Sequence, residues 1–327
     1  MTDPSLHAGS GRSPSPRPTE RTAMSTADPA AERLRIGSAP DSWGVWFPED
    51  EHQTPWQRFL DEVAEAGYRW IELGPYGYLP TDPGRLLDEL ARRNLALSAG
   101  TCFTAFHRGD VWQQTWEHVS QVAELTTALG AEHLVVIPEM WRDPATGEQL
   151  EDRLLGDRSW TALGAGVDRL ARALFEEYGV RMQFHPHADS HVDTQPHVER
   201  FLEITDPDLV TLCLDTGHIS YCGGDNLELI RKYPSRIGYL HLKQVDPRVL
   251  EEVAAEDLPF GPAVRRGVMC EPPGGVPDLA PIVEAAHDLD ADMFAIVEQD
   301  MYPCAPQAPL PIATRTHQYL TRCGSRR

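Results

Sequence analysis

The stretch LVTLCLDTGHISYCGGDNLELIRKYPSRIGYLHLK, residues 209–243, contains one full repeat of a pattern that runs through the chain. Its apolar segments, 209–215 and 236–242, predict buried strands, and the more polar segment near 225–233 predicts a short helix between them. A strand, a helix and a second strand in this order indicate that the two strands pair in parallel.

The same alternation continues on both sides of this stretch. Further strands are expected at 34–39, 68–74, 95–100, 132–138, 180–185 and 292–298. Further helices are expected at 54–66, 82–93, 111–129, 159–177, 195–204, 278–289 and near 310–322. Gly67, Gly130 and Gly179 each follow an expected helix, where a glycine commonly ends the helix. Residues 139–157 read as a polar loop, and 244–277 contain no clear strand.

Eight strand and helix units within about 290 residues predict an α/β fold, the (β/α)8 TIM barrel. An open, doubly wound parallel sheet is the alternative, and it would normally carry a glycine-rich phosphate turn after its first strand. The turn at that place is APDSWGVW, residues 39–46, which has no GxGxxG pattern. We therefore expect a single barrel domain over residues 34–327.

Residues 1–33 are rich in Pro, Ser and Thr and have little apolar surface to bury, so we expect a disordered tail. Met24 is a second candidate for the first residue of the protein. The four arginines of this segment balance its four acidic residues, so the net charge of −21 belongs to the predicted barrel.

This acidity excludes several classes of function. The chain carries 29 Lys and Arg against 50 Asp and Glu, which argues against binding to nucleic acid or to anionic membranes. No apolar run approaches the roughly 20 residues of a membrane helix, and no apolar signal segment begins the chain. The six cysteines form no CxxC pair, so we expect free thiols and a cytoplasmic protein; a homo-oligomer stays possible.

Polar residues stand at the ends of four consecutive predicted strands. TIM barrels build their active sites at the carboxyl ends of the strands, where this chain places His185, Asp215, His241 and Glu298. A single such histidine is usually only hydrogen-bonded, and a single such aspartate is often only a helix cap. The four together are the ligands that Mn²⁺, Co²⁺, Zn²⁺ or Fe²⁺ prefers, and a cation would neutralise the carboxylates. We therefore predict one divalent metal site.

Three further residues accompany these four. His187 and Lys243 each follow a predicted ligand by two positions and so share its face of an extended strand, and His218 follows Asp215 across a glycine turn. We expect His187, His218 and Lys243 to be catalytic or to bind substrate. The alternatives are a loop position for His187 and a hydrogen bond at a helix entry for His218.

Aromatic residues cluster after the first two predicted strands. Trp43, Trp46 and Tyr76 are predicted to contact the apolar face of a sugar or cyclitol ring, and Glu72 to orient the substrate. The alternatives are that the aromatic side chains cap the barrel core and that Glu72 pairs with an arginine.

Four stretches of the chain carry a family resemblance: APDSWGVWFPED, AGYRWIELGPYGYLPTDP, LDTGHISYCGGD and HLKQV. Residues 35–300 resemble the xylose-isomerase-like TIM barrel superfamily of sugar isomerases and epimerases, and within it the inosose-dehydratase-like proteins of inositol catabolism. The resemblance implies that Asp215, His241 and Glu298 bind one divalent metal. At the first ligand position, where isomerases and epimerases usually have Glu, this chain has His185. The superfamily also contains the DNA repair enzyme endonuclease IV, which the net charge of −21 disfavours.

The resemblance implies a metal-dependent lyase that dehydrates a keto-cyclitol such as 2-keto-myo-inositol through an enediolate. Glu298 is the first candidate for the base, ahead of His187 and His218, and His187, His218 and Lys243 are candidates for the acid. Mn²⁺ or Co²⁺ is favoured, with Zn²⁺, Fe²⁺ or Mg²⁺ as alternatives. The alternative activities are a keto-sugar or inosose isomerase or epimerase, a 3-keto-glycoside lyase, and an inactive sugar-binding barrel.

Overall fold

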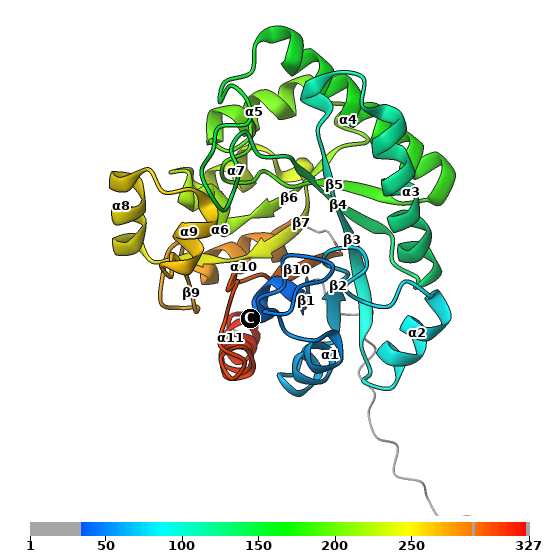
Figure 1. Ribbon diagram of the computed structural model, residues 1–327, viewed down its shortest axis with the longest axis vertical. Coiled ribbons are helices and arrows are strands. Elements are labelled where there is room, and N and C mark those ends of the chain that lie inside the picture. The colour runs from blue at the N-terminus through cyan, green and yellow to red at the C-terminus, as the bar shows by residue number, and fades with distance from the viewer. Residues whose placement is uncertain (1–33, 290–291, 325–327) are drawn as a thin grey trace, which may run out of the picture. The chain divides into compact units, whose positions relative to one another are not determined.

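Eight parallel strands close into a barrel in the computed structural model, which describes residues 34–289 and 292–324 (Figure 1). The predicted tail 1–33, with Met24, lies outside the described residues. The barrel strands are β1 (Leu34–Ser38), β2 (Trp70–Glu72), β3 (Ala96–Thr104), β4 (His133–Pro138), β5 (Arg181–Phe184), β6 (Thr211–Asp215), β7 (Ile237–Leu242) and β10 (Met293–Val297). Their order around the barrel is β1-β10-β7-β6-β5-β4-β3-β2, which confirms the TIM barrel and rules out the open sheet.

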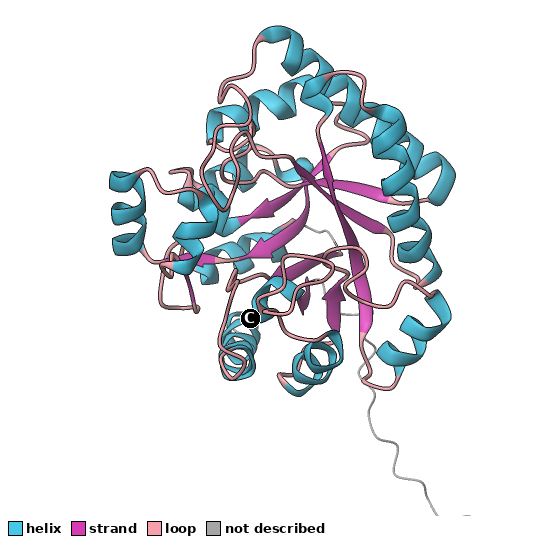
Figure 2. Cartoon of the chain, viewed as in Figure 1, coloured by secondary structure: helices cyan, strands magenta, loops and turns pink. Residues whose placement is uncertain are grey.

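Helices flank the strands, as Figure 2 shows. The helices are α1 (Trp56–Glu65), α2 (Pro83–Ala91), α3 (Trp112–Ala128), α4 (Asp157–Tyr178), α5 (Gln195–Ile204), α6 (Thr216–Tyr221), α7 (Asn226–Lys232), α8 (Pro247–Glu256), α9 (Phe260–Arg265), α10 (Leu279–Asp288) and α11 (Pro309–Gly324), with short 3-10 helices η2 (Pro40–Trp43), η3 (Phe106–Arg108) and η4 (Pro234–Arg236). Among the described residues, no helix combines the length and the apolar character needed to cross a membrane.

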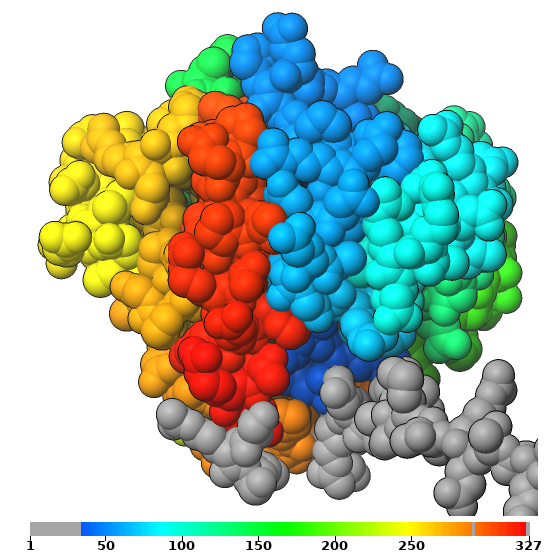
Figure 3. All heavy atoms as spheres, turned by 90° about the horizontal axis from the view of Figure 1, so that it is seen from below, coloured from blue at the N-terminus to red at the C-terminus, as the bar shows by residue number. Residues whose placement is uncertain are grey.

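The two ends of the barrel chain meet. Strand β1 pairs with β10 along its whole length, from Leu34 opposite Met293 to Ser38 opposite Val297. Helix α11, red in Figure 3, lies against α1, blue in the same view. The last strand therefore completes the ring of hydrogen bonds that the first strand begins.

Alternation along the strands separates an outer core from the barrel interior. In β6, Leu212 and Leu214 belong to the main hydrophobic core, whereas Cys213 belongs to the inner cluster. Because side chains on a strand alternate between its two faces, Asp215 also points inward, one layer above Cys213. Tyr239 fills the interior beside Cys213, and its hydroxyl donates a hydrogen bond of 2.9 Å to Ser98 Oγ. This packed layer forms the floor below the strand ends.

The predicted helix ends are confirmed at three glycines. Gly67, Gly130 and Gly179 follow α1, α3 and α4 with φ values of 105°, 79° and 70°, a backbone region that favours glycine. Several helices begin at an aspartate whose side chain accepts a backbone N–H, as Asp82 does from Arg85 at 2.8 Å. These local signals explain why the main helices were predictable.

The segment 244–277 differs from the prediction. It contains α8 and α9 (yellow to gold in Figure 1) and a small antiparallel sheet of β8 (Gln244–Val245) and β9 (Met269–Cys270). Pro247 does not break α8, because it is the first residue of that helix, directly after the capping Asp246. The segment has its own apolar core, from which Phe260 reaches the candidate site.

Candidate active site

Four buried side chains converge at the carboxyl ends of neighbouring strands. His185 directly follows β5, Asp215 ends β6, His241 lies in β7, and Glu298 directly follows β10. One nitrogen or oxygen atom from each residue lies within 4.8 Å of the corresponding atoms of the other three. The barrel thus brings together all four residues that the sequence predicts as metal ligands.

The donor atoms of these four residues face a common point. Asp215 Oδ2 lies 3.3 Å from His185 Nε2 and 3.6 Å from His241 Nδ1, and Glu298 Oε2 lies 2.9 Å from the same His241 nitrogen. The second Asp215 oxygen accepts the backbone N–H of His218 at 2.8 Å and so caps α6. One carboxylate therefore both starts a helix and faces the cluster.

Glu72 orients His241 from below. Nε2 of His241 donates to Glu72 Oε1 at 2.7 Å, and Nδ1, on the cluster side, faces Glu298 Oε2 at 2.9 Å. An imidazole held by a carboxylate through one nitrogen, with the other nitrogen turned toward further ligands, is the usual arrangement of a metal-binding histidine. Glu72 is 1% exposed and does not line the cavity, so its placement corrects the expectation that it contacts substrate. The donor set of two imidazoles and two carboxylates fits a divalent cation.

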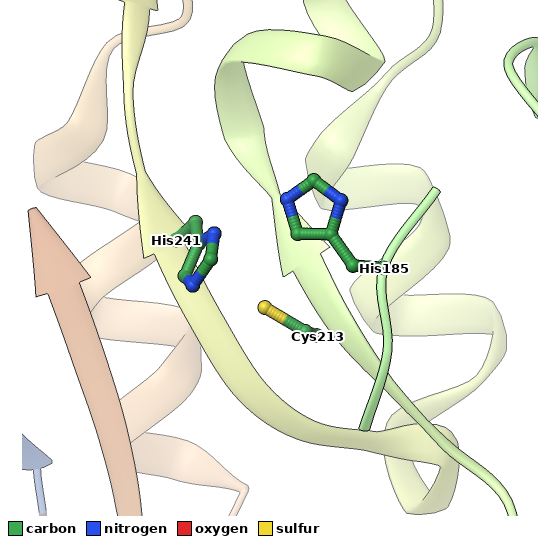
Figure 4. A group of neighbouring side chains, drawn as sticks. All are labelled: His185, Cys213 and His241. Atoms are coloured by element: carbon green, nitrogen blue, oxygen red, sulfur yellow. The ribbon is translucent and has the colours of Figure 1, made fainter. Parts of the chain in front are cut away.

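Cys213 lies one layer below the cluster. Figure 4 shows its sulfur pointing between the rings of His185 and His241, and these three residues also form a close group. Burial raises the pKa of the Cys213 thiol to about 12. His185, Asp215, His241 and Glu298 already supply four donors without Cys213.

The side chain of Lys243 places a buried ammonium group beside the cluster. Its Nζ lies 2.9 Å from Glu298 Oε2, 3.2 Å from Asp215 Oδ2 and 2.7 Å from Asp300 Oδ2. Burial alone would lower the pKa of Lys243, but these three carboxylates hold it well above its ordinary value. Burial likewise opposes ionisation of Glu298, whose pKa His241 and Lys243 hold below the ordinary range.

The sequence Asp215-Thr216-Gly217-His218 is built around Lys243. Thr216 Oγ1 donates to the Lys243 carbonyl at 2.7 Å and accepts the Lys243 N–H at 2.9 Å. A Cβ at Gly217 would lie 2.5 Å from Cγ of Lys243, so only glycine leaves room for the lysine stem. This contact gives a physical reason for the two motifs, DTGH and HLK, to occur together in the chain.

His187 and His218 form a neutral pair beside the cluster. Their ring centroids are 3.9 Å apart, and both rings contact Phe260. Burial and the neighbouring His185 lower the pKa of His187 to about 3, and burial with His187 lowers that of His218 well below its ordinary value. Both imidazoles therefore favour the neutral form near pH 7.

A cavity of about 490 Å³ opens above the cluster. Trp46 and Tyr76, which are expected to contact substrate, line it together with Phe260, and the Trp46 indole N–H donates to Asp300 Oδ1 at 3.1 Å. Trp43 lies elsewhere: it is fully buried in the core against Phe59. The expectation that Trp43 contacts substrate is thus corrected.

Two further carboxyl groups that line the cavity, those of Asp41 and Asp300, are not among the predicted site residues. Asp41 follows β1, at the start of η2, and Asp300 follows Glu298 by two residues. Burial, then the charges of Glu298 and Asp300, raises the pKa of Asp41 well above its ordinary value, and burial also raises that of Asp300. Their positions at strand ends were the available signal.

A closed βα barrel with a buried His, Asp, His and Glu cluster at its carboxyl end defines the class of protein. Residues 60–323 match the family model described as xylose isomerase-like TIM barrel, and the chain belongs to this family. The predicted resemblance is confirmed.

Two curated relatives match most of the chain. The chain is 33% identical to an inosose dehydratase of Geobacillus kaustophilus (strain HTA426) over 302 residues, covering 88% of this chain and 94% of the relative. It is 28% identical to an inosose dehydratase of Clostridium perfringens (strain 13 / Type A), covering 88% of this chain and 96% of the relative.

Solved structures share the fold at lower sequence identity. The probable 3-DHS dehydratase AsbF of Bacillus anthracis matches with a TM-score of 0.65 at 17% identity, over 88% of this chain and 98% of that one. The IOLI protein with a bound zinc atom matches with a TM-score of 0.65 at 16% identity, over 88% and 97% of the two chains.

Proposed function

We propose that this protein is a divalent-metal-dependent dehydratase that removes water from a keto-cyclitol such as 2-keto-myo-inositol. One observation carries the proposal: His185, Asp215, His241 and Glu298 form a buried cluster, with Lys243 beside it, at the base of an aromatic-lined cavity. The 33% identity to an inosose dehydratase over nearly the whole chain supports the choice of substrate.

The four clustered side chains would hold one cation. Two imidazoles with two carboxylates suit a borderline ion, and we propose Mn²⁺ or Co²⁺, with Zn²⁺, Fe²⁺ or Mg²⁺ as alternatives. When bound, such a cation polarises the ketone and stabilises the negative charge that develops on its oxygen as the α-proton leaves. Glu72 would keep His241 in the orientation that this binding needs.

Proton removal is assigned to Glu298. Its pKa is held low, so its carboxylate is ionised at neutral pH, and it borders the cavity. The Lys243 ammonium, 2.9 Å from that carboxylate, would bind a substrate oxygen and keep it near the base. The high pKa of Lys243 makes it a hydrogen-bond donor rather than an acid.

Protonation of the departing hydroxyl is assigned to Asp41. Its raised pKa favours the protonated form of a carboxyl group that borders the cavity. A carboxylic acid kept neutral by burial is a suitable general acid at neutral pH. His187 and His218, neutral at that pH, would instead bind substrate hydroxyls, since both border the cavity.

The aromatic wall supports a ring-shaped substrate. Trp46 stacks on Tyr302 with ring centroids 5.1 Å apart, which holds the indole at the cavity. Aromatic faces pack well on the C–H faces of sugars and cyclitols, while the polar floor binds their hydroxyl groups. The partner that we propose is thus a small polyol or keto-sugar.

The test uses the purified full chain loaded with Mn²⁺ or Co²⁺ and mixed with 2-keto-myo-inositol. We expect loss of one water by mass spectrometry and the ultraviolet absorbance of a dione product. Asp215→Asn should abolish turnover, whereas Glu62→Gln, a buried change outside the cluster, should retain it. No turnover with any of the proposed metals would contradict the dehydratase.

The same experiment in deuterium oxide distinguishes the alternative activities. Deuterium uptake without loss of water would indicate an isomerase or epimerase, because the enediolate is then reprotonated. Release of a free sugar from a 3-keto-glycoside, without reaction of the cyclitol, would indicate a glycoside lyase.

A further inference from the structure

A second group of metal-binding side chains lies in the loops beside the barrel mouth. His107 belongs to η3 after β3, Glu151 to the connection between β4 and α4, and His191 to the connection between β5 and α5. One donor atom from each residue lies within 4.8 Å of the other two. This group shares no residue with the cluster at the strand ends.

The two histidines are buried and close together. His107 is 4% exposed and His191 2% exposed, and their ring centroids are 4.4 Å apart. His107 Nε2 lies 2.9 Å from Glu151 Oε2. Burial lowers the pKa of both imidazoles, so each offers a nitrogen lone pair at neutral pH.

His191 supplies an independent sign of a ligand. Its Nε2–H donates to the backbone carbonyl of Asp152 at 3.0 Å, and its Nδ1 is buried without a hydrogen-bond partner among the described residues. A buried nitrogen without a partner is costly. Fixing one imidazole nitrogen through a carbonyl while the other stays free is how proteins orient a metal-binding histidine.

Arg108 leaves one oxygen of Glu151 available. Its Nε donates to Glu151 Oε1 at 2.5 Å, so Oε2 remains on the histidine side. The same guanidinium pairs with Glu139, which borders the main cavity. The arginine thus orients the carboxylate in the way that outer hydrogen bonds orient metal-ligating carboxylates.

We propose that His107, Glu151 and His191 form a second cation site, which binds a borderline divalent ion such as Zn²⁺ or Co²⁺. Two imidazoles, one carboxylate and a water make a four-coordinate zinc site. Ligand atoms around a tetrahedral zinc are about 3.3 Å apart, so the 2.9 Å between His107 and Glu151 needs only a small adjustment. The ion joins three loops, and the loop that carries Glu151 also contributes Glu139 and Leu150 to the wall of the cavity.

The test is the metal content of the full chain after loading with Zn²⁺ and removal of free metal. We expect two ions per wild-type chain, one in Asp215→Asn and one in His191→Gln. The double variant should hold none. His197→Gln is the matched control, because His197 is a half-buried histidine near this region that is not one of the three ligands, and it should keep two ions.

A second readout does not depend on stoichiometry. In the Asp215→Asn protein, Zn²⁺ should raise the melting temperature, and His191→Gln should remove this rise. With Co²⁺ the same protein should show visible absorption bands of a four-coordinate ion, lost again in His191→Gln. Circular dichroism of each variant without metal identifies any that fails to fold, and Glu151→Gln then replaces it.

The outcomes separate this inference from the proposed function. One ion that survives Asp215→Asn but is lost in His191→Gln supports the loop site and contradicts the cluster at the strand ends. Equal metal content in wild type, His191→Gln and Glu151→Gln, with no melting shift that depends on either residue, overturns the loop site.

Discussion

Replacing Glu72 with glutamine is expected to weaken cation binding at the strand-end cluster about tenfold. Glutamine has the same length, so its side-chain oxygen can still accept the hydrogen bond that His241 Nε2 makes to Glu72 at 2.7 Å. What the substitution removes is the negative charge. The imidazole then loses the partner that makes its other nitrogen more basic toward a cation.

The size of the effect follows from the type of hydrogen bond. A hydrogen bond with one charged partner contributes about 1.5–3 kcal/mol, and a neutral one about 1 kcal/mol. A difference of about 1.4 kcal/mol corresponds to a factor of ten in a dissociation constant. Glu72→Ala removes the acceptor altogether and leaves a buried N–H unpaired, so we expect a loss near a hundredfold.

The assay is competition between the protein and a chelating dye for Zn²⁺ or Mn²⁺. The His191→Gln background removes the proposed loop site, so that only one site is titrated. Glu62→Gln is the control, since Glu62 is a buried carboxylate that accepts the Trp43 indole N–H and lies outside the cluster. The reasoning is refuted if both Glu72 variants bind the ion as tightly as the parent protein, or if Glu62→Gln weakens binding equally.

Three further outcomes are expected. Gly217→Ala, whose new Cβ would overlap the stem of Lys243, should cost about 1–3 kcal/mol in urea unfolding and at least tenfold in kcat/KM. Gly84→Ala, whose new Cβ would make only an ordinary contact at 3.6 Å, should not destabilise the protein, and unchanged kinetics in Gly217→Ala would contradict the overlap. Burial lowers the pKa of His133 to about 4, below its unfolded value near 6.5, so its stabilising contribution is complete above pH 6.5 and is lost as the pH falls toward 4. His133→Gln should therefore reduce the loss of unfolding free energy between pH 7 and 4.5 by about 2 kcal/mol, and the same pH dependence of that free energy in both proteins would contradict this. Asp82→Ala, which removes the cap of α2, should lower thermal stability by about 1 kcal/mol and leave turnover unchanged.

The barrel was predictable because its units repeat a strong local pattern. The sequence pattern predicted the apolar strands, the helices that end at a glycine, and the order of these elements. Even the boundaries of α3 and β4 lie within one residue of the predicted ones. Helix α6 after β6, and the elements β8, α8, α9 and β9 after β7, were not predicted. In α6, six residues are too few to show a helical period, and in α8 a proline at the first position resembles a break.

The site was predictable where a strand fixes the direction of a side chain. Alternation along β6 and β7 aims Asp215 and His241 inward, so their convergence followed from the fold. Strand alternation no longer predicts side-chain direction in η2, which follows β1. There the Trp43 side chain lies in the core, where its indole N–H donates to Glu62, while Asp41 borders the cavity. Sequence spacing does not predict the direction of the Trp43 side chain, since it depends on contacts with residues distant in the chain, such as Glu62.

The pairing of β1 with β10 sets when the cluster of His185, Asp215, His241 and Glu298 can be completed. His185, Asp215 and His241 precede β10 in the chain, whereas Glu298 directly follows it. A chain emerging from the ribosome therefore holds three of the four clustered side chains before it can close the ring, and gains the fourth with the strand that closes it. A cation that needs all four of these side chains can therefore bind only after β10 has been synthesised and has paired with β1.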